Sequence, residues 1–569
     1  MKRLTQLIKH LFAGVLRITP FDVKAGIAGK IGAAVKAELK RELAVELKRE
    51  LAVELKRELA VELREMLESS LLTKLRLEIR EQVDFRALWA VNRLSTDYLR
   101  IASGFLTRIS QVLEEITDGP ARNVAISELG DEWRAHLRTL AGLSAQVPAA
   151  PALADLEREL DFLREHSKLL APVFRMLAGK RVLYPGQCYY YNWYLSRALR
   201  EIGWQADLLN WDTNPASQLF YHGEDFLVGQ PGLQTLEELL EFYLNALYHY
   251  DIYHFSNSHG MSFDAELHAW IMRQCGENAE ISLLKALGKR VVYTNNGCLD
   301  GVSQTAFEKW GPVSVCSICR WRNEPTVCSD KRNLQWGAFR NIIADYQCLL
   351  GGNRVDFNDD PRVHEVPEAY CLEPAVWDPT LAIPAAYRLD SSSPNVVRLY
   401  HAVGNKEQRT SEDGVNIKCS HIYLPLVEKL KSEGLEVELV MPSGVPNMDV
   451  RFLQMQSDIV LEMLTYGWFG TNAREAMMLA KPVICFLRPE WLESLRREIP
   501  QYVDELPIIS ATPETVEEIL RDLIGNRQKR LEIGARSREF ALKWHSAAAA
   551  GRRFDEIYST LLEGHASCP

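Results

Sequence analysis

From residue 180 onward, short apolar runs alternate with segments of helical length. A strand, a helix and a second strand in this order form a βαβ unit, in which the strands lie parallel and the helix covers the sheet. In the first half of this region the expected strands are 181–187, 205–211, 250–257 and 289–297, and the expected helices are 192–203 and 279–288. The pattern predicts an open, parallel α/β sheet.

The same alternation begins again after LDSSSPN, a polar linker near residue 390. The expected strands are 396–404, 436–444, 457–464 and 481–487, and the expected helices are 421–434, 513–524, 527–544 and 547–562. The chain is therefore predicted to contain two α/β sheets in series. Ligands of such sheets bind at the carboxyl ends of the strands.

The first 36 residues form a basic, amphipathic segment with seven lysines and arginines and one aspartate. Between Leu4 and Val15 the apolar residues recur at helical spacing, and Pro20 ends the predicted helix. Because these residues lie on one face instead of forming an apolar block, the segment is unlike a signal peptide. It predicts either attachment to an anionic membrane surface or a helix packed on its own protein.

An eight-residue repeat follows this segment. The unit ELKRELAV occurs at 38–45, 46–53 and 54–61. Its residues apart from valine favour helix, so one long helix is predicted within 37–81. Since a leucine at every fourth position advances by about 40° per step around a helix, a standard two-stranded coiled coil is not favoured. Homo-oligomerisation through this helix and a role as a spacer both remain open, and residues 82–178 are predicted to form further helices.

The composition excludes several classes of protein. The chain is 47% hydrophobic and 25% charged, as is ordinary for a globular protein. It has no apolar run of about 18 residues, so a membrane-spanning helix is not expected. A net charge of −10 argues against a nucleic-acid partner. Eleven cysteines without a secretory signal indicate a reducing cytosol, so we expect a cytoplasmic protein, with peripheral attachment to the inner face of the cell membrane as an option.

A turn at GWFG (467–470) gives the strongest indication of a ligand site. It precedes a helix predicted to begin near Thr471 and Asn472 and to end near Leu479, with Glu475 inside it. The free backbone N–H groups at a helix N-terminus bind phosphate, and glycines let a ligand approach the backbone closely. The turn therefore predicts a phosphate-binding site.

The loop at 404–419 follows the first predicted strand of the second sheet and contains the cations Lys406, Arg409 and Lys418. A lysine in a loop is usually only solvated, so the loop position alone gives these cations no role.

Together these segments resemble the GT-B glycosyltransferases, and the second half resembles their family-4 type. The segment DIVLEMLTYGWFGTNAREAMMLAKPVICFL (458–487) is similar to that family's donor-binding signature. The segment 282–297 is similar to the acceptor-domain strand that usually ends in His-His-Gly. The resemblance covers about 180–562. It implies an α/β protein with two Rossmann-like domains in a GT-B arrangement, here preceded by a long α-helical region, and retaining sugar transfer that needs no metal.

The resemblance also implies roles for single residues on the donor side. In the family, cations that follow the first strand of this domain bind the donor's diphosphate. Lys418 matches the lysine of the family's Lys-Gly motif, with Cys419 in place of the glycine, and Arg409 and Lys406 are candidates for the preceding basic residue. Gly467 stands where the family commonly has a glutamate, which leaves Glu462 as a substitute carboxylate. The implied catalytic residues are Lys418, Arg409 and Glu475, and the implied donor-binding residues are Gly467, Gly470, Thr471, Asn472, Glu462 and Asn405.

On the acceptor side the implied residues are Gly186, Gln187, Asn296 and His254. Asn296 replaces the histidine that usually precedes the glycine, and an asparagine cannot carry a proton at neutral pH. His254 and His259 are alternatives. Phosphate-assisted departure of the leaving group would need no side-chain base.

Four cysteines have a spacing that suggests a metal. Cys316 and Cys319 form a C-x2-C pair, with Cys298 upstream and Cys328 downstream, and four thiolates of this kind hold structural zinc. Structural zinc, an iron–sulfur cluster and unligated thiols in a loop-rich insertion all remain open.

The sequence thus predicts a glycosyltransferase that moves a sugar from a nucleotide-sugar donor to a glycan, lipid-linked or protein acceptor in cell-surface glycan or glycoconjugate assembly. The predicted parts are the basic segment (1–36), the repeat helix (37–81), a helical region (82–178), the acceptor domain (179–390) with a Cys-rich insertion (298–348), the nucleotide-sugar domain (391–545), and a C-terminal helix and tail (546–569). Two alternatives remain: a catalytically inactive GT-B scaffold acting through its N-terminal helix, and a sugar-nucleotide epimerase.

Overall fold

The computed structural model describes residues 152–563, with gaps at 188, 213, 229–234, 257–261, 296, 298–299, 311–313, 323, 350–353, 391–392, 394 and 405. The predictions for the basic segment, the repeat helix and residues 82–151 lie outside the described residues. So do those for Asn296, Cys298, Asn405, His259 and the tail after residue 563. The described part of the predicted helical region forms α7 (Leu153–Glu165) and α8 (Ser167–Met176).

The first sheet has seven parallel strands in the order β3-β2-β1-β4-β5-β6-β7. Its strands are β1 (Arg181–Pro185), β2 (Gln205–Asn210), β3 (Phe226–Leu227), β4 (Ile252–Phe255), β5 (Arg290–Thr294), β6 (Tyr346–Leu349) and β7 (Val363–Glu365). Helices cover both faces, so consecutive residues such as Val182, Leu183 and Tyr184 are all fully buried. The direction of strand order reverses between β1 and β4, which is where ligands of such sheets bind.

The helices of this domain are α9 (Tyr191–Glu201), α10 (Pro215–Gln218), α11 (Leu236–His249), α12 (Ala265–Cys275), α13 (Ala279–Ala286), α14 (Gln304–Glu308) and α15 (Asp330–Ile343). The Cys-rich stretch 298–348 is more regular than a loop-rich insertion, because it contains α14, α15 and most of β6. Cys348 is therefore a buried residue of the sheet itself.

The second sheet has four parallel strands in the order β11-β10-β8-β9. They are β8 (Val397–His401), β9 (Val437–Val440), β10 (Ile459–Leu461) and β11 (Val483–Ile484). The helices are α16 (Lys406–Arg409), α17 (Ser420–Ser432), α18 (Asn447–Met455), α19 (Thr471–Met478), α20 (Pro489–Glu498), α21 (Pro500–Glu505), α22 (Val516–Gly525) and α23 (Arg527–Trp544). The predicted α/β class with two Rossmann-like sheets is confirmed.

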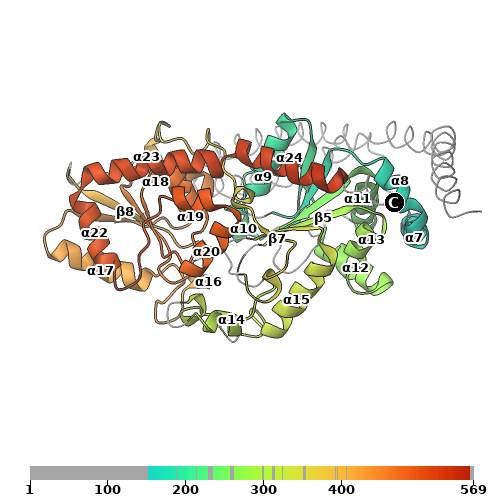
Figure 1. Ribbon diagram of the computed structural model, residues 1–569, viewed down its shortest axis with the longest axis horizontal. Helices are drawn as coiled ribbons and strands as arrows, with labels where there is room; N and C mark the ends of the chain where they lie inside the picture. The colour runs from blue at the N-terminus through green and yellow to red at the C-terminus, as the bar shows by residue number, and fades with distance from the viewer. Residues whose placement is uncertain are drawn as a thin grey trace, which may run out of the picture. The chain divides into compact units, whose positions relative to one another are not determined.

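The last helix, α24 (Ala547–Glu563), packs on the first sheet's domain although it follows the second in sequence (Figure 1). A Cβ atom on Gly551 would lie only 3.0 Å from the Cβ of Ala198 in α9. The Tyr558 hydroxyl lies 3.0 Å from the hydroxyl of Tyr184 in β1. The chain thus crosses from the first domain to the second and returns. Among the described helices, none combines the length and the apolar character needed to span a membrane.

A buried carboxyl group lies where β7 meets α20. Ser494 Oγ donates a hydrogen bond to Glu365 Oε1 at 3.1 Å, and the Glu365 backbone N–H donates to Glu498, which also pairs with Arg354. Burial raises the pKa of Glu365 to about 7, although Arg354 and Ser494 act to lower it. The folded state therefore favours the protonated carboxyl group, and stability is lost as pH rises from about 4.5 towards 7 and above.

We expect Glu365→Gln to raise the free energy of unfolding at pH 8 by about 2 kcal/mol and to change it little at pH 5. Urea unfolding at the two pH values measures this. Glu493→Gln on α20, whose side chain is 67% exposed, is the control and should show no such pH dependence. Equal effects of Glu365→Gln at both pH values would contradict the raised pKa.

Candidate functional site

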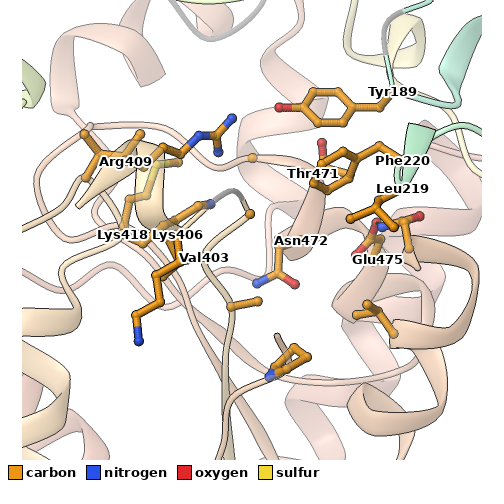
Figure 2. Close-up of a pocket in the computed structure, with 18 of the residues that line it drawn as sticks. Tyr189, Leu219, Phe220, Val403, Lys406, Arg409, Lys418, Thr471, Asn472 and Glu475 are labelled. Carbon is orange, nitrogen blue, oxygen red and sulfur yellow. Dashed lines mark hydrogen bonds between the residues drawn. The ribbon is translucent and has the colours of Figure 1, made fainter. Parts of the chain in front are cut away.

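A cavity of about 720 Å³ lies where the loops at the carboxyl ends of the two sheets meet (Figure 2). The first sheet's loops contribute Tyr189, Leu219, Phe220 and Gly297, and the second sheet's contribute Lys406, Arg409, Lys418, Gly444, Gly470, Thr471 and Asn472. The loops after β8 and β10 both line it, and the order of the second sheet reverses between these two strands. The cavity is therefore at the place where a doubly wound sheet binds its ligand.

Three cations of the loop after β8 line one side of the cavity. Figure 2 shows Lys406 and Lys418 on the side opposite Tyr189 and Phe220, and the Arg409 guanidinium extending towards that aromatic side. Lys406 is exposed and Arg409 is half-buried, and within the described part of the chain neither forms an ion pair with another side chain. Their charges are thus available to an anionic ligand.

Lys418 is held by a buried carboxylate. Its Nζ atom lies 2.6 Å from Glu462 Oε1, and the Asn472 amide donates to the same oxygen at 3.3 Å. The Lys418 side chain is 11% exposed and that of Glu462 is fully buried. Burial acts to raise the pKa of Glu462, but Lys418 and Asn472 bring it below the usual value, so the carboxylate is ionised at neutral pH. Glu462 itself does not line the cavity.

The N-terminus of α19 opens into the cavity beside Lys418. Gly470 is the N-cap residue and provides no side-chain cap, so the first backbone N–H groups of the helix remain available to a ligand. A Cβ on Gly470 would lie 3.5 Å from Lys418 Nζ. Gly467 has a φ of 96° and packs beneath Arg488, outside the cavity, so it shapes the turn and does not face the ligand.

Glu475 is fully buried and joins the two domains. Its Oε1 atom accepts hydrogen bonds from the Tyr190 hydroxyl at 2.7 Å and from Asn447 Nδ2 at 2.8 Å, and its Oε2 accepts from Gln454 Nε2 at 3.2 Å. Burial raises the pKa of Glu475, although these three donors act to lower it. Tyr191, next to Tyr190, also bonds through its hydroxyl to Thr471. Two consecutive tyrosines of the first domain are thus attached to α19.

Three of the predicted acceptor-side residues lie outside the cavity. Gly186 has a φ of 93° and turns the chain after β1, while Gln187 Nε2 donates to the Gly223 carbonyl at 2.8 Å. His254 is buried between Tyr558 and Thr294, with a ring nitrogen 2.6 Å from each hydroxyl oxygen. Burial lowers its pKa to about 3, so His254 is a neutral core residue in this arrangement.

The predicted zinc ligands are only partly described, because Cys298 lies outside the described residues. Among the residues that the structure does describe, no three His, Cys, Asp or Glu side chains are grouped closely enough to hold a metal ion. Cys316, Cys319 and Cys328 therefore do not form a metal site by themselves. The stretch they belong to still reaches the cavity through Cys319 and Trp321.

The sequence analysis missed the aromatic residues of the first domain. Tyr189 and Phe220 line the cavity, and Tyr190 and Tyr191 bond to α19. Three consecutive tyrosines, 189–191, follow the first predicted strand, and this run was the sequence signal that could have indicated an aromatic loop at the site. Asn447 was also missed; its backbone N–H donates to the Leu219 carbonyl at 2.8 Å, which is a further link between the domains.

No family model and no curated protein sequence matches the chain. Among solved structures, sucrose-phosphate synthase from Thermosynechococcus elongatus is 13% identical over 68% of this chain and 100% of its own, with a TM-score of 0.39. WaaG, a glycosyltransferase involved in lipopolysaccharide biosynthesis, is 14% identical over 66% and 99%, with a TM-score of 0.35. UDP-GlcNAc 2-epimerase from Neisseria meningitidis is 12% identical over 67% and 100%, with a TM-score of 0.37. These values are low, so the function is argued below from the residues of this chain.

Proposed function

We propose that the chain is a glycosyltransferase that uses a nucleotide-sugar donor bound in the cavity between the two sheets. The observation that carries this proposal is the convergence of Lys406, Arg409 and Lys418 with the open N-terminus of α19. Fixed cations and helix N–H groups together bind a diphosphate and stabilise its charge as it leaves the sugar. The resemblance in sequence to GT-B glycosyltransferases supports the same reading.

The lining of the cavity favours departure of the diphosphate without a side-chain base. Among the described lining residues, Glu475 is the only carboxylate and there is no histidine. Glu475 is already hydrogen-bonded by three donors, and His254 is in the core. We therefore propose retaining transfer, in which the leaving phosphate accepts the proton of the attacking hydroxyl and the chain's cations stabilise the phosphate. The acceptor would belong to cell-surface glycan or glycoconjugate assembly.

Thermal unfolding with UDP-, GDP- and CDP-sugars tests the proposal. A ligand at about 100 times its Kd adds about 2.7 kcal/mol of stability, which is readily seen as a rise in Tm. We expect one nucleotide class to raise the Tm of the wild-type protein. We expect Arg409→Ala to weaken this binding by at least about tenfold, because it removes a charged phosphate donor. Arg497→Ala on α20, a 70% exposed arginine, is the control.

The outcomes separate the proposal from its two alternatives. Absence of any shift with wild-type protein would favour a scaffold that has lost its donor. A shift accompanied by an epimerised nucleotide sugar in the absence of acceptor would favour an epimerase. A shift that Arg409→Ala weakens and Arg497→Ala leaves unchanged supports the proposed donor site.

A further inference from the structure

Tyr189 has a backbone conformation that large side chains rarely adopt. It is in the loop after β1 with a φ of 52°, in the left-handed region that favours glycine. Backbone strain of this kind persists only where neighbouring contacts hold it, and it concentrates at ligand-binding and catalytic sites. The side chain of Tyr189 lines the cavity and is half-buried.

Tyr189 and Phe220 together form an aromatic wall of the cavity. Their ring centroids are 5.5 Å apart and the rings are perpendicular, and Tyr191 meets Tyr189 edge-on at 6.1 Å. The Phe220 ring reaches the second domain, since its Cζ would lie 3.1 Å from a Cβ on Gly404, at the start of the cation loop. Packing thus fixes the wall on the side of the cavity opposite Lys406 and Lys418 (Figure 2). Arg409 approaches the wall, because its Nη1 atom would lie 3.8 Å from the same Cβ on Gly404.

The aromatic wall has no charge of its own. The first domain's contribution between 189 and 220 consists of Tyr189, Ala216, Leu219 and Phe220, with one phenol hydroxyl as the polar group. Such a surface suits an uncharged ring that has an apolar C–H face and a few hydroxyl groups. These four residues offer no cation of their own to pair with a phosphate, a carboxylate or an acidic peptide. The cation that approaches them is Arg409, beside Gly404, which the proposed function assigns to the donor's diphosphate.

We propose that the aromatic wall of Tyr189 and Phe220 receives a neutral sugar ring of the acceptor, so that the acceptor is a glycan. This rests on the proposed function, in which the cations opposite are occupied by the donor's diphosphate. The sugar ring packs its C–H face on Tyr189 while the attacking hydroxyl points to the donor. Tyr189 is then a positioning and specificity residue for the acceptor.

The test uses glycine to separate the ring from the backbone strain. Glycine adopts a positive φ freely, so the relief of backbone strain in Tyr189→Gly should offset part of the packing that is lost with the ring, and the full chain should stay folded with a small change in Tm. Asn278→Gly is the matched control, because Asn278 has a φ of 56° at the start of α13 and does not line the cavity. Tyr189→Phe keeps the ring and removes only the hydroxyl.

The probes are methyl glucoside, galactoside, mannoside and N-acetylglucosaminide, observed by saturation-transfer NMR with and without the nucleotide that stabilises the protein. We expect Tyr189→Gly to weaken binding of the preferred methyl glycoside at least about tenfold, Tyr189→Phe less, and Asn278→Gly not at all. The nucleotide-induced shift in Tm should persist in all three variants.

Unchanged glycoside binding in Tyr189→Gly, or no glycoside binding to the wild-type protein, would overturn the inference. A loss of nucleotide affinity in Tyr189→Gly with glycoside binding intact would also overturn it and would place a nucleoside on the wall. The wild-type protein could also bind a glycoside through Tyr189 and yet bind no nucleotide sugar. That result would support the sugar site at the aromatic wall and refute the proposed donor site.

Discussion

Lys418→Ala is expected to destabilise the protein by about 3 kcal/mol at pH 7.5, because it leaves the Glu462 carboxylate buried without its cation. Glu462 is fully buried, and Lys418 Nζ, 2.6 Å away, is the charge that keeps it ionised. Removing one partner of a buried pair costs far more than the pair contributes. Urea unfolding of the full chain at pH 7.5 measures the loss.

The pH dependence of this loss gives a sharper check. In the wild-type protein the pKa of Glu462 is lowered, so the stability that this group contributes is present above its unfolded pKa and is lost as pH falls through the folded one. Without Lys418, burial raises the pKa, and stability is then lost as pH rises. The deficit of Lys418→Ala should therefore shrink between pH 7.5 and pH 5.

A double variant serves as the control. Lys418→Met with Glu462→Gln removes both charges and should recover most of the lost stability. A Lys418→Ala deficit that is the same at both pH values, or that the double variant does not relieve, would show that the pair is not the cause. Lys418→Ala removes a cation of the donor site and also destabilises the fold around Glu462, so a loss of nucleotide binding in this variant does not separate the two effects. Arg409→Ala removes a cation without breaking a buried ion pair and is the clearer variant for the donor site.

The alternation of apolar runs was sufficient to predict both sheets, because strands buried on both faces are apolar at consecutive positions. Strands β1, β4 and β5 follow this rule, as Val291, Val292 and Tyr293 illustrate. Three strands of the first sheet were missed: β3, which has only two residues, and β6 and β7, which carry buried polar residues. Gln347 is buried and its amide donates to Asn341 Oδ1 at 3.1 Å, and that partner is not visible in a local pattern.

The candidate site was predicted better on one side than on the other. Lys418, Gly470 and Asn472 were chosen from the resemblance to the family's motifs, and they lie together in the structure because they follow strand ends of one sheet. His254 also follows the pattern, but α24 returns to the first sheet and Tyr558 takes the histidine into the core. Tyr189 and Phe220 line the cavity only because the two domains face each other, and no local spacing encodes that.

Glu475→Ala is expected to lower the free energy of unfolding by about 3 kcal/mol or more, because it leaves three buried donors without their acceptor. These are the Tyr190 hydroxyl, the Asn447 amide and the Gln454 amide, which reach Glu475 from the first domain and from α18. Urea unfolding of the full chain measures the loss. Glu475→Gln keeps an acceptor oxygen and should be milder, since burial raises the pKa of Glu475 and so disfavours the charge that this variant removes.

Tyr190→Phe distinguishes a link between the domains from a contact with the donor. It breaks the hydrogen bond to Glu475 but keeps the stacked contact of the ring with His222 at 4.3 Å, so we expect a loss of only about 1 kcal/mol. If Glu475 binds the donor when Tyr190 releases it, Tyr190→Phe should retain or strengthen the nucleotide-sugar shift in Tm while Glu475→Gln weakens it. If Glu475 only joins the domains, both variants should bind the nucleotide sugar alike, because the cations and the helix N-terminus that hold the diphosphate are unchanged in each.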